Sequence, residues 1–301
     1  MDKQIEEVKS LSCHTSGVFS VVVIDDKTLA SVGLDKQLVT WDLAEGKVLT
    51  KCAFEQELSC VEKLDENRLL VGDNTGKTFL FDVKQNKVVD TFTEEELAAR
   101  VNKILKLSDT VFVAGYNEDN LRVWNITDKT SKTFADISTN YTSGIAKLGQ
   151  NKIAVTTNCS VFILDWTTLT VDKTYGWDSE TLNVNLDNMD NNDCYSLQVL
   201  PDNNLVLGFD CGLVLGLNST TLEVVFKQII SADQQLNDVV LDGDNLYYAT
   251  AKGDVICFNY VLKQKINEKK VHSEGIKRMI KLNDKQVVTA SLDSSLKVLN
   301  F

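Results

Sequence analysis

The sequence predicts an all-β protein built from seven similar four-stranded units that close into a ring. Two observations carry this prediction. A strand pattern first seen as LVTWDL, around Trp41, recurs at intervals of 40 to 53 residues along the 301-residue chain. Each copy lies among other runs of strand composition, which short polar turns such as DDK and PDNN separate. A period of this length is typical of supersecondary units that stack or form a circle.

The seven copies share an alternation of apolar and polar residues with a large apolar side chain at the fourth position. These key positions are Trp41, Phe81, Trp124, Leu164, Leu217, Phe258 and Leu299. Two strand-like runs precede each copy, and a weaker run follows every copy except the last. Each unit is therefore expected to be an antiparallel meander of four strands. A single blade of this kind cannot bury both faces, so we expect a seven-bladed β-propeller in which circular packing covers every blade.

The whole chain, residues 1–301, is expected to form this one domain. The blades are expected at roughly 14–52, 57–92, 100–135, 141–175, 193–228, 236–268 and 272–301, with 4–12 added to the last. The last unit stops after its third strand, and residues 4–12 precede the first unit without a blade of their own. We expect this N-terminal segment to supply the missing outer strand and close the ring through backbone hydrogen bonds. The alternative is a frayed N-terminus.

The first and seventh units resemble WD repeats. That family places a His before the first strand of a blade, Ser or Thr on the second, Asp in the following turn, and Trp on the third strand. The matching residues are His14, Ser31, Asp35 and Trp41 in the first unit and His272, Thr289 and Asp293 in the seventh, where Leu299 stands at the Trp position. Both His-to-Asp intervals are 21 residues, and the chain has only two histidines. The resemblance covers the whole chain and implies a WD-repeat propeller with structural tetrads.

These residue types suit a structural network because a buried carboxylate is costly unless donors surround it. The Asp can accept from the His ring, the ring can meet the hydroxyl, and the hydroxyl can meet the indole N–H. Reading His14, Asp35 and Ser31 as a catalytic set is the alternative, which the lack of a GxSxG turn disfavours. The five middle units depart from the pattern and have no His; near the Asp position they carry Thr75, Glu118, Asn158, Cys211 and Lys252.

The composition limits the classes of partner. The formal net charge is -12 and the pI is about 4.7, which disfavours nucleic acid and anionic membranes as direct partners. No apolar run reaches the roughly 20 residues of a membrane helix, and the first residues, MDKQIEEVKS, do not resemble a signal peptide. We expect a location inside the cell, in the cytoplasm or alternatively the nucleus. The seven cysteines form no CxxC pair, so reduced thiols and no metal or cofactor are expected.

The sequence contains no P-loop, dinucleotide fingerprint, HExxH or EF-hand pattern. We therefore expect no enzymatic activity. Together with the resemblance, this predicts a scaffold or adaptor that holds peptide segments of partner proteins on its loop faces, monomeric alone and working within a complex. The alternatives are a propeller-based hydrolase and a subunit of a nucleic-acid-associated complex.

One sector of the ring is expected to be strongly acidic. Between Lys173 and Lys227 there is no Lys or Arg, whereas eight Asp and Glu residues occur there. Part of this window is the long link between the fourth and fifth blades, from about 176 to 193, on the face that carries the tetrad turns. We predict that a Lys/Arg-rich partner segment binds there by ion pairing and cation–π contact. The candidate residues are Trp177, Asp178, Glu180, Asp187 and Asp190. The alternative is that Trp177 packs on the blade edge and the acids keep a loop solvated.

Overall fold

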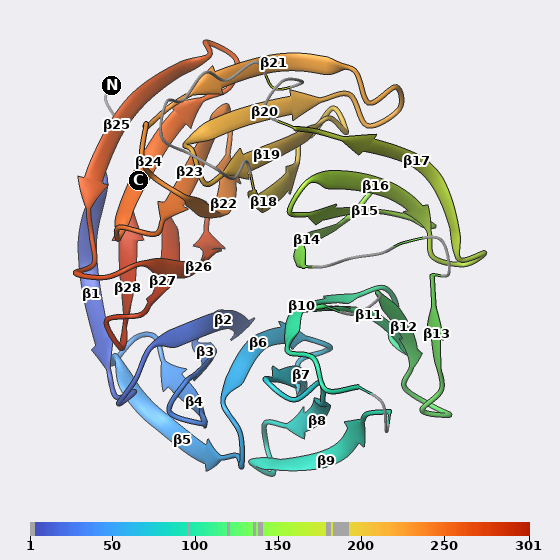
Figure 1. Cartoon of the computed structure of the whole chain (residues 1–301). Helices are drawn as coiled ribbons and strands as arrows, with labels where there is room; N and C mark the ends of the chain where they lie inside the picture. Colours follow the sequence, from blue (N-terminus) through green and yellow to red (C-terminus); the bar gives the residue numbers. More distant parts are fainter. Residues whose placement is uncertain are drawn as a thin grey trace.

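The computed structural model shows seven four-stranded antiparallel sheets arranged around a central axis (Figure 1). The structure describes residues 4–94, 97–118, 121–134, 137, 141–178, 182 and 193–301. In six sheets the strands follow chain order from the axis to the rim. The predicted all-β propeller of seven blades is confirmed.

The described residues contain 28 strands, which form the blades in chain order except that the first strand belongs to the last blade. Blade 1 contains β2 (Val18–Asp25), β3 (Thr28–Gly33), β4 (Gln37–Asp42) and β5 (Lys47–Ala53); blade 2 contains β6 (Leu58–Lys63), β7 (Arg68–Asp73), β8 (Thr78–Asp82) and β9 (Lys87–Phe92); blade 3 contains β10 (Val101–Lys106), β11 (Val111–Tyr116), β12 (Arg122–Asn125) and β13 (Ser131–Thr133); blade 4 contains β14 (Thr142–Lys147), β15 (Lys152–Thr157), β16 (Ser160–Asp165) and β17 (Thr170–Gly176). Blade 5 contains β18 (Cys194–Val199), β19 (Leu205–Phe209), β20 (Leu213–Leu217) and β21 (Val224–Ile229); blade 6 contains β22 (Leu236–Asp242), β23 (Asn245–Thr250), β24 (Asp254–Asn259) and β25 (Gln264–Lys270); blade 7 contains β26 (Ile276–Asn283), β27 (Gln286–Ser291), β28 (Ser295–Asn300) and β1 (Glu6–Ser12).

The two ends of the chain meet in blade 7. Strand β1 pairs antiparallel with β28, so the order of this sheet is β1-β28-β27-β26. The buried side chain of Leu11 belongs to the apolar cluster between blades 7 and 1. The Nζ of Lys9 donates to the carbonyl oxygens of Leu43 and Ala44 in blade 1, at 2.6 and 2.7 Å. The predicted closure by the N-terminal strand is confirmed, and the frayed terminus is excluded.

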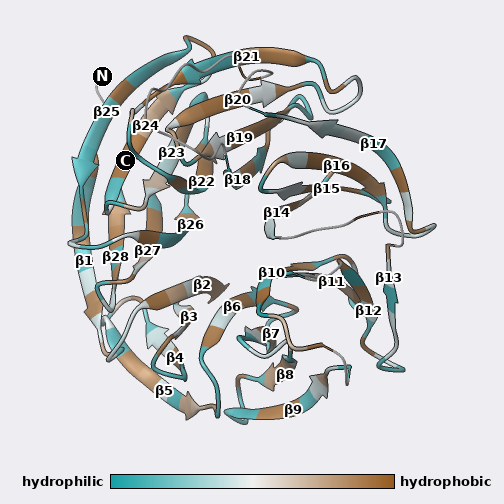
Figure 2. Ribbon diagram, in the orientation of Figure 1, coloured by the Kyte–Doolittle hydropathy of each residue, from teal (hydrophilic) through white to brown (hydrophobic). Residues whose placement is uncertain are grey.

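The core is divided among the contacts between blades. Seven apolar clusters occur in the described residues, and each joins two neighbouring blades, including the pair formed by the last blade and the first. Middle strands such as β19 and β20 are buried along their whole length and apolar in colour, whereas the outer strand β25 is mainly hydrophilic (Figure 2). Hydrophobic burial therefore acts between blades, which explains why the pattern must repeat to be stable.

One face of the ring is formed by the turns between the second and third strands of each blade together with the links from one blade to the next. We call it the tetrad face. These two kinds of segment are bonded to each other: Leu34 N–H donates to Gly17 O at 2.9 Å in blade 1, and Leu292 N–H donates to Gly275 O at 2.9 Å in blade 7. Gly253, with a φ of +88°, approaches the next link so closely that a Cβ there would lie 2.5 Å from the carbonyl oxygen of His272. The backbone of the tetrad face is thus closely packed.

All seven cysteines lie in the described ranges and none of them forms a disulfide; four are buried. Within the described ranges, no helix is long and apolar enough to cross a membrane.

Removing residues 1–12 should expose the edge of β28 and the apolar cluster that Leu11 covers. We expect a lower melting temperature and concentration-dependent association, because an unpaired strand edge is a template for pairing with another chain. Scanning calorimetry and size-exclusion chromatography measure both effects. Removing only residues 1–3 leaves β1 intact and is the matched control; if both truncations melted and eluted like the full chain, closure by β1 would not matter for stability.

Candidate binding face and central channel

The tetrad of blade 1 forms a continuous hydrogen-bond chain from the turn to the core. His14 Nδ1 lies 2.9 Å from both carboxylate oxygens of Asp35, and His14 Nε2 lies 2.7 Å from Ser31 Oγ. The indole N–H of Trp41 donates to the same hydroxyl oxygen at 2.8 Å. Asp35 also accepts the backbone N–H groups of Thr15 and Gln37. The network therefore ties a link, a turn and two strands together.

Blade 7 repeats this arrangement without the Trp. His272 Nδ1 lies 2.9 Å from Asp293 Oδ2, and its Nε2 lies 2.8 Å from Thr289 Oγ1. Burial lowers the pKa of both His14 and His272, so the imidazoles are neutral near pH 7. A neutral ring with its Nδ1 proton toward the carboxylate can accept the hydroxyl proton at Nε2. Both histidines of the chain are held in these two networks.

Blades 2 and 3 use other residues at corresponding places. In blade 2, Asp73 is buried and accepts the backbone N–H groups of Thr75 and Lys77 as well as the Thr75 hydroxyl. In blade 3, the indole N–H of Trp124 donates to Tyr116 Oη at 3.0 Å. The carboxylate in the turn of blade 2 and the indole N–H of blade 3 are thus hydrogen-bonded without a histidine.

A β-bulge occurs at the start of every innermost strand. In each of the seven blades the pairing between the first two strands skips the second residue of the innermost strand. A bulge leaves this residue unpaired and re-aims its side chain. The bulged residues are Phe19, Ser59, Asn102, Ser143, Tyr195, Asn237 and Lys277. All seven line one hollow, together with Arg100, Lys103 and Tyr141.

This hollow lies at the mouth of the central channel on the tetrad face, because each innermost strand begins there. Its volume is about 150 Å³. Below it, the channel wall contains an ion pair in which Arg278 Nη1 lies 3.3 Å from Asp238 Oδ2. Asp238 Oδ2 also accepts the backbone N–H of Met279 at 2.8 Å. Burial raises the pKa of Glu62 and lowers the pKa of Lys103, so the charges in the channel are poorly hydrated.

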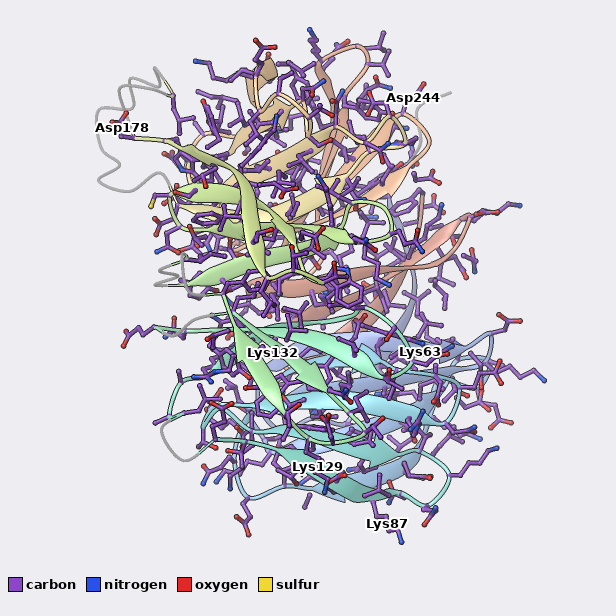
Figure 3. All side chains as sticks on the ribbon, turned by 90° about the vertical axis from the view of Figure 1, so that its right-hand side faces the viewer. Lys63, Lys87, Lys129, Lys132, Asp178 and Asp244 are labelled. Carbon is purple, nitrogen blue, oxygen red and sulfur yellow. The ribbon has the colours of Figure 1, made fainter. Side chains whose placement is uncertain are left out.

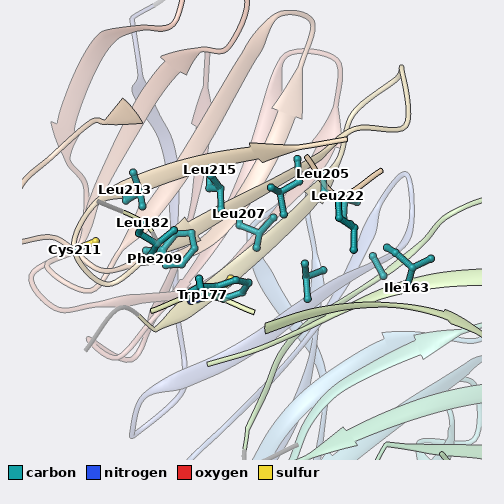
Figure 4. Packing of buried hydrophobic residues seen from close by; sticks show 14 residues of the cluster. Ile163, Trp177, Leu182, Leu205, Leu207, Phe209, Cys211, Leu213, Leu215 and Leu222 are labelled. Atoms are coloured by element: carbon teal, nitrogen blue, oxygen red, sulfur yellow. The ribbon is translucent and has the colours of Figure 1, made fainter. Parts of the chain in front are cut away.

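Trp177 does not present an open ring to a partner. Its side chain is 6% exposed and packs edge-on against Phe209, with the ring centroids 5.3 Å apart (Figure 4). It belongs to the apolar cluster between blades 4 and 5, which also includes the buried Leu182. Large aromatic rings gain most by such burial. The expectation that Trp177 seats a cation is therefore corrected: the ring packs on the blade edge, as in the alternative reading.

Of the four acids predicted beside Trp177, one lies in the described residues. Asp178 is exposed at the edge of the tetrad face, on the opposite side of the ring from Asp244 (Figure 3). Glu180, Asp187 and Asp190 lie outside the described residues. Their role in binding stays a prediction.

Two further acids lie next to the channel mouth and were not among the candidates. Asp210 is in the turn between β19 and β20, and its backbone N–H donates to the carbonyl oxygen of Asp193 at 3.0 Å. Burial, together with the nearby charge of Asp193, raises the pKa of Asp210 to about 6. Burial also raises the pKa of Asp193. A cation brought by a partner would stabilise both carboxylates.

Comparison with known proteins gives two partial likenesses. No family model matches the chain. Mouse WD repeat-containing protein 41 is 24% identical over 322 aligned residues, which cover 97% of this chain and 68% of the mouse protein. The ribosome biogenesis protein ytm1 of Schizosaccharomyces pombe is 28% identical over 120 residues, which cover 38% of this chain and only 27% of the yeast protein. The match along nearly the whole of this chain, the two histidine networks and the seven closed blades point in the same direction. The chain is a seven-bladed β-propeller that is similar to WD-repeat proteins.

Sequence reasoning named the tetrad residues of blades 1 and 7, and it missed the channel mouth. The seven bulged residues come from seven different strands and lie 40 to 52 residues apart, so no short stretch of sequence contains the site. One signal was available: each bulged residue is the second residue of its innermost strand, so aligning the repeats would have placed the seven in one column. Among the described residues, no group of three or more His, Cys, Asp or Glu side chains is placed to hold a metal ion.

Replacing Asp35 with Ala should lower the free energy of unfolding by about 2–4 kcal/mol, because His14 and two backbone N–H groups lose their acceptor. His14→Ala should have a similar effect. Thr75→Ala should lower it by less than about 1 kcal/mol, because Asp73 keeps its backbone donors. Denaturant melts of the three variants provide the comparison. Equal losses at Asp35 and Thr75 would contradict the view that the tetrad braces blade 1.

Proposed function

We propose that this propeller is a non-catalytic scaffold that holds peptide segments of other proteins on its tetrad face. The observation that carries the proposal is the constant backbone of that face combined with its variable side chains. The same bulge occurs in all seven blades, yet the bulged residue is aromatic in two, a polar amide in two, serine in two and lysine in one. A rigid frame with diverse side chains is suited to recognition of a specific partner.

The alternative of a propeller-based hydrolase has less support. Both histidines are engaged in tetrads, and in the channel Asp238 and Arg278 are paired with each other. General acid–base catalysis would need a group free to move a proton near a substrate.

A nucleic-acid-associated complex is the second candidate, which the likeness to the ribosome biogenesis protein ytm1 favours. The net charge of -12 supports contact through a protein partner of such a complex, since direct binding to nucleic acid depends on cationic side chains. Affinity purification with and without nuclease treatment distinguishes the cases: partners of a scaffold that contacts protein should remain bound after the nucleic acid is digested.

The preferred partner segment is rich in Lys and Arg and binds near blades 4 and 5. The support is the absence of Lys and Arg from residues 174–226, the exposed carboxylate of Asp178 and the poorly hydrated pair Asp193 and Asp210. Trp177 is not part of this surface because it is buried. Glu180, Asp187 and Asp190 belong to it by sequence alone. Ion pairs of this kind mainly raise the association rate and weaken with salt.

A Lys/Arg-rich peptide should bind the wild type more weakly as salt rises, and should bind at least about tenfold more weakly when four acids are neutralised. The variant replaces Asp178, Asp187 and Asp190 with Asn and Glu180 with Gln. The control neutralises four acids in turns on the opposite face, Glu66, Asp109, Asp244 and Asp284, so that the net charge changes equally. Fluorescence anisotropy measures the affinities. Equal affinities for the two variants would remove the acidic sector as a binding site.

The same titration should depend on pH through Asp210. Its carboxyl has a pKa of about 6, so it loses its charge as the pH falls from 7.5 to 5, whereas exposed carboxylates stay ionised. The affinity for a histidine-free basic peptide should therefore fall over this range. Asp210→Asn should bind more weakly at pH 7.5 and show a smaller change with pH. An identical pH profile for this variant and the wild type would show that Asp210 does not contact the peptide.

A further inference from the structure

Three cationic side chains converge on the hollow at the channel mouth. The guanidinium carbon of Arg100 lies 4.3 Å from the centroid of the Phe19 ring, and Lys277 Nζ lies 5.8 Å from the same centroid. Lys103 lines the hollow as well. One aromatic ring thus holds two cations close together, in a protein whose net charge is -12. The convergence is a local feature and does not follow from the overall charge.

These cations are poorly compensated. The residues that line the hollow include no Asp or Glu. Burial lowers the pKa of Arg100, of Lys103 and of Lys277, and the charge of Arg100 lowers that of Lys277 further. The carboxylates that act on the cluster from outside are Glu57 on Arg100 and Asp238 on Lys103. Asp193 and Asp210 also lie next to the hollow, where they act on the lining residue Tyr195. Asp238 is already paired with Arg278.

Hydrogen-bond donors in the hollow are also unused. Among the described residues, Arg100 Nε and Asn102 Nδ2 are buried without an acceptor. Other lining residues are satisfied: Ser59 Oγ donates to Val101 O at 2.6 Å, and Asn237 Nδ2 donates to Ile276 O at 2.8 Å. A buried donor without an acceptor is costly, so such groups are a sign of a ligand that accepts hydrogen bonds.

We propose that the hollow binds one oxyanion, a phosphate monoester on a partner peptide or free phosphate. Its volume of about 150 Å³ is below the roughly 300–1,000 Å³ of pockets for larger ligands, and suits a single compact group. Phosphate carries about two negative charges near neutral pH and several acceptor oxygens, so it matches three cations better than a carboxylate does. Arg100 and Asn102 supply directional donors, and Lys103 and Lys277 supply charge.

This site uses other residues than the acidic sector of the proposed function and does not depend on it, although Asp193 and Asp210 of that sector lie next to the hollow. It lies on the axis of the ring and takes an anion, whereas the sector beside blades 4 and 5 takes a cation. The experiments on the two sites use different variants and ligands, so one proposal can be contradicted while the other holds.

The test is a titration with inorganic phosphate at constant ionic strength, with chloride as the reference salt. We expect phosphate to raise the melting temperature of the wild type relative to chloride, because a ligand that binds the folded state stabilises it. Isothermal titration calorimetry should show that Arg100→Gln with Lys277→Gln weakens phosphate binding by at least about tenfold. The control, Lys84→Gln with Lys285→Gln, removes two exposed cations from turns on the opposite face and should leave the affinity within about twofold.

A purely structural role for the cations is distinguished by stability without phosphate. The double variant should then melt at or above the temperature of the wild type, because two repelling and poorly hydrated charges are gone. A large loss of stability would show that the cations serve the fold. If the variant did not fold, the wild-type comparison decides, and equal melting temperatures in phosphate and chloride would overturn the proposal.

The source of the phosphate is settled by a pair of peptides that differ only in one phosphoserine. Tighter binding of the phosphorylated peptide, lost in Arg100→Gln with Lys277→Gln, assigns the site to a phosphorylated partner. Binding of inorganic phosphate without any preference between the peptides assigns it to free phosphate.

Discussion

The antiparallel pairing of β1 with β28 is the interaction on which the ring depends. Every apolar cluster in the described structure lies between two blades, so each blade is stable only if both neighbours are present. An open ring would leave the outer faces of the first and last blades uncovered. The pairing of the chain ends fixes the last blade beside the first and converts a linear array into a closed set of seven equivalent contacts.

The two histidine tetrads lie on either side of this seam. Blades 7 and 1 are neighbours in the ring although they are most distant in the sequence, and they carry His272 and His14. Closing contacts between distant segments has the largest entropic cost, so additional hydrogen bonds are most useful there. The middle blades are joined by the continuous chain, and blades 2 and 3 satisfy their turns or indoles with Asp73 and Tyr116.

The fold was predictable because repetition supplies its own evidence. Alternating strands, a period near 40 residues and two His-to-Asp pairs at the same interval all predicted one architecture, and the N-terminal strand followed from counting. The site was less predictable. Trp177 and its neighbouring acids formed a visible group in sequence, but burial of an indole between two blades outweighs its use as an exposed cation seat. The channel mouth depends on seven side chains that the closed ring brings together, so no local pattern contains it.

The bulge at the start of each innermost strand affects which positions of this protein can accept amino-acid substitutions. The bulged residue takes no part in the pairing of the first two strands, so its identity is less constrained by the sheet than that of its neighbours. One such residue in every blade faces the same hollow. Ser59 and Asn237 use their side chains to bond the next blade, whereas the other five make no such bond to a neighbouring blade in the hydrogen bonds described above. Substitutions at those five positions can change the binding preference of the axis while the register of the blades is retained.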